Sequence, residues 1–159
     1  MRYMKQRDNY SCGPVAIMNV LKWAGLKFSY GEKIDYISKL CKCKAPGGSY
    51  HNHFDKALRN VTDGLLKIQK IKRPKLAQIE EHLKTGGVVI INYAWKKIDK
   101  KGRHYALIAD INKSELSMLL INDFEKGPAR CWVSRQMFRT YNLRFQRTDP
   151  YYKAWFVYK

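Results

Sequence analysis

The nine residues Gln6-Arg7-Asp8-Asn9-Tyr10-Ser11-Cys12-Gly13-Pro14 decide how this chain is organised. They place one cysteine, Cys12, at the start of a predicted helix over 13–23, whose apolar residues recur at the spacing of a helix packed on one side. Pro14 falls in the first turn of this helix, where the missing N–H costs nothing. Unpaired backbone N–H groups and the positive end of the helix dipole should therefore point at Cys12. This setting predicts a lowered thiol pKa and a nucleophilic thiolate.

Gln6 lies six residues before Cys12, close enough for its amide to reach back beside the sulfur. The Gln6 amide and the Cys12 backbone N–H would together form an oxyanion hole. The alternative for Cys12 is a small buried hydrophobic residue without a chemical role.

The composition is that of one globular domain spanning 1–159, with enough apolar residues for a core. Four cysteines are too few for a disulfide scaffold, and Met1 leads so directly into the cysteine stretch that we expect no signal peptide. The longest apolar run, 88–91, is far too short to span a bilayer. We therefore expect a soluble, cytoplasmic protein that needs no cofactor.

The net charge of +18 favours an anionic partner, which is nucleic acid, an acidic protein or a charged membrane surface. No nucleic-acid-binding motif narrows this choice. Two basic clusters, 67–75 and 96–103, are the densest, and the second leads directly into His104. The second cluster would border a substrate cleft beside His104 and select an acidic substrate. The alternative is that both clusters are solvated surface.

Apolar periodicity predicts helices in the first half of the chain and mostly strands in the second. After the helix over 13–23, which Gly25 should end, three more are expected to carry the apolar positions within 34–41, 54–61 and 76–83. A short helix over 136–141 is expected before the last strand. The predicted strands are 65–71, 88–95, 103–110, 116–122, 129–133 and 154–158. N-terminal helices packed on a C-terminal antiparallel sheet make an α+β fold.

Several polar residues have the spacing of helix caps. Ser29 and Glu32 form a predicted capping box, Ser49 is the predicted cap of the third helix, and Ser134 caps the short helix.

His104 opens the apolar strand His104-Tyr105-Ala106-Leu107-Ile108, where a general base would be held rigidly against a facing helix. Asp123 follows the next predicted strand and would orient the imidazole. Asn122 is the neighbouring candidate, and alternation allows only one of the two to face His104. The alternatives are a half-buried histidine and a turn aspartate without chemical roles.

The combination of these motifs resembles the C39-like cysteine peptidases, papain-fold enzymes related to the peptidase domain of bacteriocin-exporting transporters. Gln6 before Cys12-Gly13, His104-Tyr105 before an apolar strand, and Asp123 one strand later carry the resemblance. It continues through segments 48–59, 76–91 and 132–138, in one order over nearly the whole chain.

The resemblance implies Cys12 as nucleophile, His104 as general base, Asp123 as the residue that orients it, and Gln6 as oxyanion donor. It implies hydrolysis of a peptide or isopeptide bond in a protein or peptide substrate, with cleavage after two glycines in the transporter relatives. Two positions depart from the family: Ser11 replaces an aspartate common in relatives, and Phe124 replaces a proline. Neither removes a catalytic atom, but both leave the substrate open.

Two other functions remain open from the sequence. One is a catalytically silent papain-fold module that binds nucleic acid or an acidic protein, and the other is an amidase or acyltransferase with the same triad.

The remaining cysteines and histidines suggest no metal site. Cys41-x-Cys43 and His51-x-His53 lack the usual spacing of zinc ligands, so no metal is expected. His82 is expected to be exposed on its helix, and Cys131 in the core of its strand. The double glycines Gly47-Gly48 and Gly86-Gly87 would be self-cleavage sites in such a family, but turns and helix ends explain them more simply.

Overall fold

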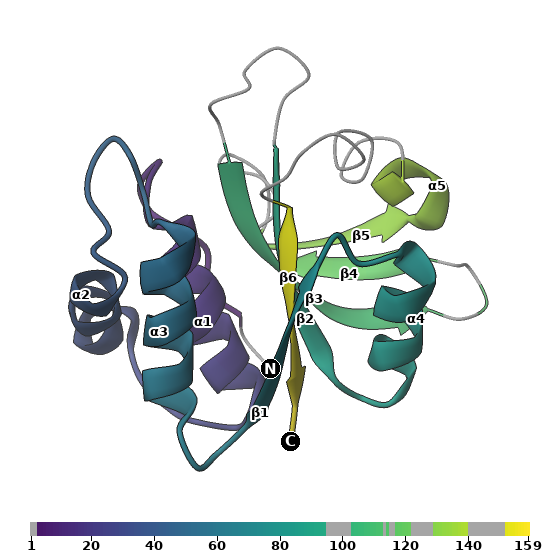
Figure 1. Cartoon of the computed structure of the whole chain (residues 1–159), viewed down its shortest axis with the longest axis horizontal. Helices are drawn as coiled ribbons and strands as arrows, with labels where there is room; N and C mark the ends of the chain where they lie inside the picture. Colours follow the sequence, from purple (N-terminus) through teal and green to yellow (C-terminus); the bar gives the residue numbers. More distant parts are fainter. Residues whose placement is uncertain (1–2, 95–102, 113, 115–116, 122–128, 140–151) are drawn as a thin grey trace.

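The computed structural model describes residues 3–94, 103–112, 114, 117–121, 129–139 and 152–159 (Figure 1). The helices and strands follow one another along the chain as α1 (Cys12–Trp23), α2 (Tyr30–Leu40), α3 (His51–Thr62), β1 (Lys67–Lys72), α4 (Leu76–Lys84), β2 (Val88–Ala94), β3 (Arg103–Asn112), β4 (Ser117–Ile121), β5 (Arg130–Ser134), α5 (Arg135–Met137) and β6 (Lys153–Tyr158). The predicted helices and strands are confirmed to within a few residues, except that α5 is only three residues long where the structure describes it.

The strands form a six-stranded sheet in the order β1-β6-β2-β3-β4-β5 within the described residues, and every neighbouring pair is antiparallel. The predicted α+β fold is therefore confirmed. The last strand, β6, enters between β1 and β2, which are close in sequence. This insertion places Trp155 opposite both Lys70 of β1 and Ile90 of β2.

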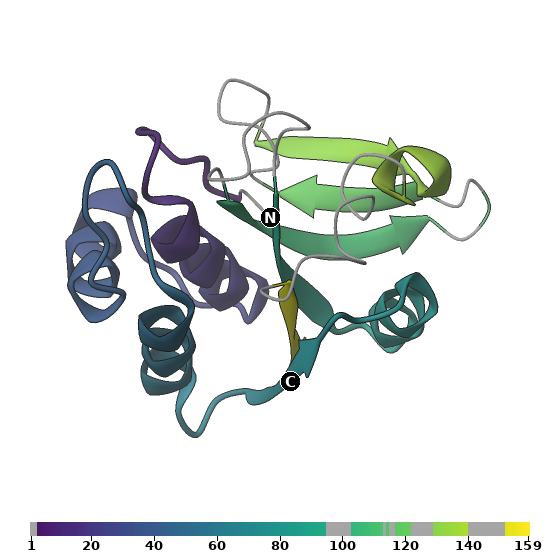
Figure 2. The same ribbon diagram turned by 45° about the horizontal axis from the view of Figure 1, so that its top comes forward.

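Helices cover both faces of the sheet (Figures 1 and 2). The N-terminal helices α1, α2 and α3 lie on one side and α4 on the other. α1 packs on β3, and α4 packs on β2 and β3.

Alternation along the strands divides the core between these two faces. Toward the N-terminal helices, the sheet buries residues such as Ile90, Leu107 and Trp155. Toward α4, it buries their neighbours, such as Ile91, Ile108 and Phe156, together with Ile79 and Leu83 of the helix. The apolar run 88–91 is buried throughout because both sides of β2 are covered.

Helix α1 is buried at every position but Lys22 because it contacts α2, α3 and β3 together. Gly25, with φ of 97°, follows the end of the helix in the left-handed region that a glycine adopts without a steric penalty. The predicted role of Gly25 is confirmed.

The predicted caps are confirmed at α2 and α5 but not at α3. Ser29 Oγ accepts from the Glu32 backbone N–H at 3.3 Å, and the Glu32 side chain accepts from Ser29 N–H at 2.8 Å. Ser134 Oγ accepts from Met137 N–H at 3.1 Å. The residue preceding α3 is Tyr50, so the prediction for Ser49 is wrong. Ser49 instead lies against Gly13 at the start of α1.

His82 is buried, and the expectation that it is exposed is wrong. Its Nε2 lies 3.1 Å from both Val88 O and Val157 O, so it joins α4 to β2 and β6. Gly87 makes room for the ring, since a Cβ there would lie 2.3 Å from His82 Nε2. Burial lowers the pKa of His82 and keeps the ring neutral.

Strand β1 is one edge of the sheet and carries part of the first basic cluster. Exposed lysines on an edge strand oppose pairing with another chain, which gives this cluster a structural role. Lys70 forms an ion pair with Asp55 at 3.3 Å. Among the residues that the structure describes, no helix has the length and apolarity needed to cross a bilayer.

Candidate active site

Cys12 is the first residue of α1 and is buried where this helix begins. Three backbone N–H groups point at its thiol, namely those of Tyr105, Gly13 and Cys12 itself. The contact with Tyr105 brings the thiol to the His104 end of β3. The two segments whose motifs resemble a nucleophile and a base, almost a hundred residues apart, therefore lie side by side.

Gly13 allows α1 to lie close to the start of α3. A Cβ at Gly13 would lie 2.9 Å from Ser49 Oγ and 3.3 Å from the ring of Phe54. Phe54 in turn stacks on Tyr105, with ring centroids 4.2 Å apart. The glycine after the cysteine is therefore required by packing.

The loop before Cys12 is fixed by Asp8, a role that was not predicted from the sequence. Its Oδ1 accepts from Tyr10 N–H at 2.9 Å and from Ser11 N–H at 2.6 Å. An aspartate just ahead of a helix is the sequence signal for such a turn. The Gln6 amide donates to Asp8 O at 2.7 Å, which fixes the buried Gln6 side chain in the same loop.

The segment leading to Gln6 is held against α1 by Asn19, a second residue whose role was not predicted from the sequence. Asn19 Oδ1 accepts from Met4 N–H at 2.7 Å, and Asn19 Nδ2 donates to Met4 O at 2.9 Å. In the sequence, the signal is that Asn19 is a polar residue on the apolar side of the predicted helix. In the structure, its side chain is fully buried. Such a residue needs partners, and the backbone of Met4 supplies them.

Burial raises the pKa of the Cys12 thiol to about 11, because the surroundings disfavour a charged sulfur. The three N–H groups lower the pKa, but burial has the larger effect. The expectation of a lowered pKa is therefore wrong in direction. The sequence predicts that Cys12 lies at the start of a helix, but it does not predict how deeply the thiol is buried.

Two more thiols lie near Cys12, and all four cysteines are free. Cys43 Sγ donates to Tyr10 O at 3.2 Å, so this thiol contacts the loop that precedes Cys12. Burial raises the pKa of Cys41 to about 12. In the described part of the chain, no group of histidine, cysteine or acidic residues has an arrangement that could hold a metal ion. Cys131 lies in β5 and is partly buried against the core on the α4 side.

His104 is buried near the start of β3, opposite Tyr93 of β2. Its backbone carbonyl accepts from Asn92 Nδ2 at 3.3 Å, which links the two strands at this end. Asp123 and the alternative Asn122 lie outside the described residues, as does the basic segment 96–102. β4 ends at Ile121, opposite Leu107.

The fold is shared with solved peptidase structures. A protein from Bacillus anthracis assigned as a C39-like peptidase matches with a TM-score of 0.70 and 12% identity, over 99% of this chain and 94% of that one. The chain has the fold of the C39-like peptidases. A double-glycine-motif protease from an AMS/PCAT transporter, solved with a leader peptide, matches this C39-like fold with a TM-score of 0.63 and 14% identity, over 99% and 91% of the two chains. No family model matches the sequence, and neither does any curated protein.

Proposed function

We propose that this chain is a cysteine peptidase or isopeptidase, with Cys12 as nucleophile, His104 as general base, Asp123 as the residue that orients His104, and Gln6 as oxyanion donor. One observation carries the proposal: in a C39-like fold, the Cys12 thiol at the start of α1 contacts the N–H of Tyr105, the residue after His104.

The thiol's raised pKa defines the first step of the proposed mechanism. Cys12 is protonated at rest, and His104 takes its proton as the sulfur attacks the carbonyl carbon of the substrate. The Cys12 N–H and the Gln6 amide stabilise the resulting oxyanion. His104 then donates the proton to the leaving amine, which departs and leaves an acyl-enzyme. A water molecule, deprotonated by His104, attacks the acyl group and releases the acid and the thiol.

The proposed substrate is a protein or peptide. Support comes from the transporter protease of similar fold, which was solved with a leader peptide. Cleavage after two glycines is one outcome to be tested, because the two chains are only 14% identical.

Two observations favour a second function, a catalytically silent module that binds an anionic partner. The buried thiol with a pKa of about 11 is less nucleophilic than an activated cysteine. Strict alternation along β3 would also place His104 on the face of Ala106, opposite to Tyr105. Cys12 lies in the same core as Tyr105, so the imidazole would point away from the thiol. The net charge of +18 would then be the functional feature.

A peptide library prepared from a digested proteome separates the two functions. We expect new peptide ends with the wild type, and none with Cys12→Ser or His104→Ala. Cys131→Ser is the matched control and should cleave like the wild type, because Cys131 lies away from α1 on β5. Undiminished cleavage by Cys12→Ser, or none by the wild type, would contradict the proposal. Capture of the acyl group by an added amine would identify an acyltransferase instead.

A further inference from the structure

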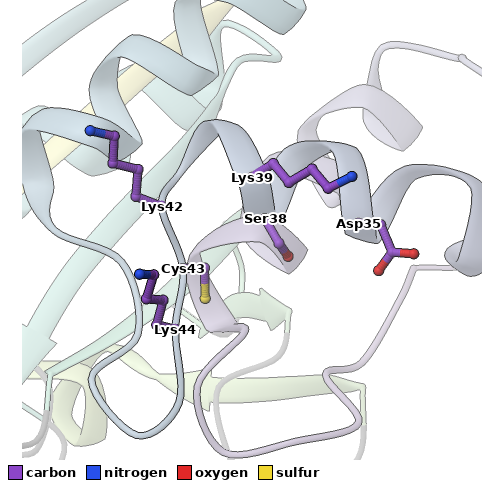
Figure 3. Close-up of a pocket in the computed structure, with 6 residues that line it drawn as sticks. All are labelled: Asp35, Ser38, Lys39, Lys42, Cys43 and Lys44. Carbon is purple, nitrogen blue, oxygen red and sulfur yellow. The ribbon is translucent and has the colours of Figure 1, made fainter.

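A pocket of about 470 Å³ lies at the end of α2 and in the loop that follows it (Figure 3). Its lining carries three lysines and a single acidic residue: Asp35, Ser38, Lys39, Lys42, Cys43 and Lys44. Among the described residues, no ion pair involves any of these lysines. The lining therefore carries an excess of positive charge, three lysines against one aspartate.

The pocket adjoins the loop over 6–11, which precedes the proposed nucleophile Cys12 and is called the nucleophile loop below. Cys43, whose thiol lies between Lys44 and Ser38 in Figure 3, donates to Tyr10 O at 3.2 Å. Tyr10 is two residues before Cys12. The Cys12 and Cys43 thiols are also close enough that a charge on Cys43 disfavours one on Cys12.

The shape of the loop is held by backbone contacts. Cys43 N–H donates to Ser38 O at 2.9 Å, and Gly48 N–H donates to Lys44 O at 2.8 Å. Gly48, with φ of 70°, lies so close to the nucleophile loop that a Cβ would be 3.3 Å from Tyr10 O. Lys42 and Lys44 therefore stand on a loop that is fixed relative to the nucleophile loop, and Lys39 lies near the end of α2.

Lys42 occupies a position where glycine is common. Its φ of 48° is in the left-handed region directly after α2, where a residue with a side chain is strained. A lysine held there adds a positive charge to the pocket.

We propose that this pocket binds the carboxylate of an aspartate or glutamate side chain in a peptide held across Cys12. The inference rests on the proposed function and assigns it a substrate class. Three ammonium groups and the Ser38 hydroxyl supply donors for a carboxylate. A peptide is favoured over a free anion because the pocket lies beside the nucleophile loop.

Protection of Cys43 from alkylation tests the binding step without requiring catalysis. The probes are a triglutamate peptide and a triglutamine peptide, both with blocked ends, and peptide mapping reports the modification of Cys43 at alkaline pH. We expect triglutamate to slow the reaction severalfold and triglutamine to leave it unchanged. Equal protection by both peptides would overturn the proposal, as would equal protection by inorganic phosphate at the same charge concentration.

Charge-reversal variants locate the effect. Lys42→Glu should abolish the protection, and Lys39→Glu is the second variant if the first fails to fold. Lys33→Glu is the matched control, since Lys33 is an exposed lysine of α2 outside the pocket. Loss of protection in Lys33→Glu to the same extent would show a general charge effect and refute the pocket.

Cleavage profiles separate failure of the pocket from failure of the proposed function. The wild type should prefer library peptides with an acidic residue at a fixed distance from the cut, and Lys42→Glu should raise KM for these peptides with little change in kcat. Cleavage without this preference would refute the pocket alone. Protection of Cys43 without any cleavage would refute the peptidase and retain the acidic-peptide site.

Discussion

Cys12 combines two opposing influences on one sulfur atom. Backbone N–H groups at the start of α1 favour thiolate, while the depth of the thiol favours the neutral form and prevails. In the proposed mechanism, a thiol that is protonated at rest requires His104 to act during the attack and not before it.

Alkylation measures this resting state. With a pKa of about 11, only about one Cys12 in ten thousand is thiolate at pH 7, so iodoacetamide should react slowly there and faster as the pH rises. Peptide mapping follows each cysteine, with half-buried Cys131 as the internal reference. Rapid reaction at neutral pH that is lost in His104→Ala would show instead a preformed thiolate–imidazolium pair.

Gly13 should tolerate no side chain. Gly13→Ala places a Cβ 2.9 Å from Ser49 Oγ, so we expect a loss of about 1–3 kcal/mol in the free energy of unfolding and a fall in any peptidase activity. Urea denaturation provides the measurement. Gly47→Ala is the control, since its Cβ would meet nothing within 4 Å. Equal stability of the two variants would refute the close contact.

At the scale of elements, α4 is fastened to the sheet by a buried histidine that bonds to two strands. Gly87→Ala would put a Cβ 2.3 Å from His82 Nε2 and force the ring away from Val88 O and Val157 O. We expect a loss of about 2–3 kcal/mol, because overpacking adds to lost hydrogen bonds. Gly31→Ala, in α2 with open space around it, should be neutral or stabilising. Equal denaturant midpoints for Gly87→Ala and Gly31→Ala would contradict this role of His82.

Because His82 is buried, the stability of the fold should also be sensitive to acid. The folded-state pKa of His82 is lowered, so below about pH 6.5 the unfolded chain binds a proton that the folded protein does not. Stability should therefore fall as the pH drops, by at most about 1.4 kcal/mol per pH unit from this group. His82→Gln should lack this part of the pH dependence in urea titrations. An unchanged slope would assign the acid sensitivity to other groups.

At the scale of the whole molecule, charge should govern substrate capture. A net charge of +18 attracts acidic peptides, and salt screens this attraction. Raising the salt concentration should therefore increase KM and leave kcat nearly unchanged in steady-state assays of a peptide selected from the library. A KM independent of salt would exclude electrostatic capture.

Local patterns predicted most of the fold, because caps and alternation are read from neighbouring residues. The capping box of Ser29 and Glu32 and the predicted strand over 88–95, which is β2 in the structure, are examples. Sequence did not give the strand order, because β6 pairs with strands far away along the chain. It also missed the burial of His82, which depends on space left by Gly87, and the depth of Cys12, which depends on packing against three other elements.

The insertion of β6 has a consequence for synthesis. The ribosome delivers every other strand and all three N-terminal helices before Trp155, which packs on Phe54 at 4.6 Å between ring centroids and donates to Asp55 at 2.8 Å. Until residues 153–158 have been translated, β1 and β2 lack the strand that joins them. Trp155 also belongs to the core that contains Cys12, so the packing around this thiol is incomplete until β6 has been made. The N-terminal helices therefore have to wait for the strand that is last in the order α1 to β6 before their side of the core can close.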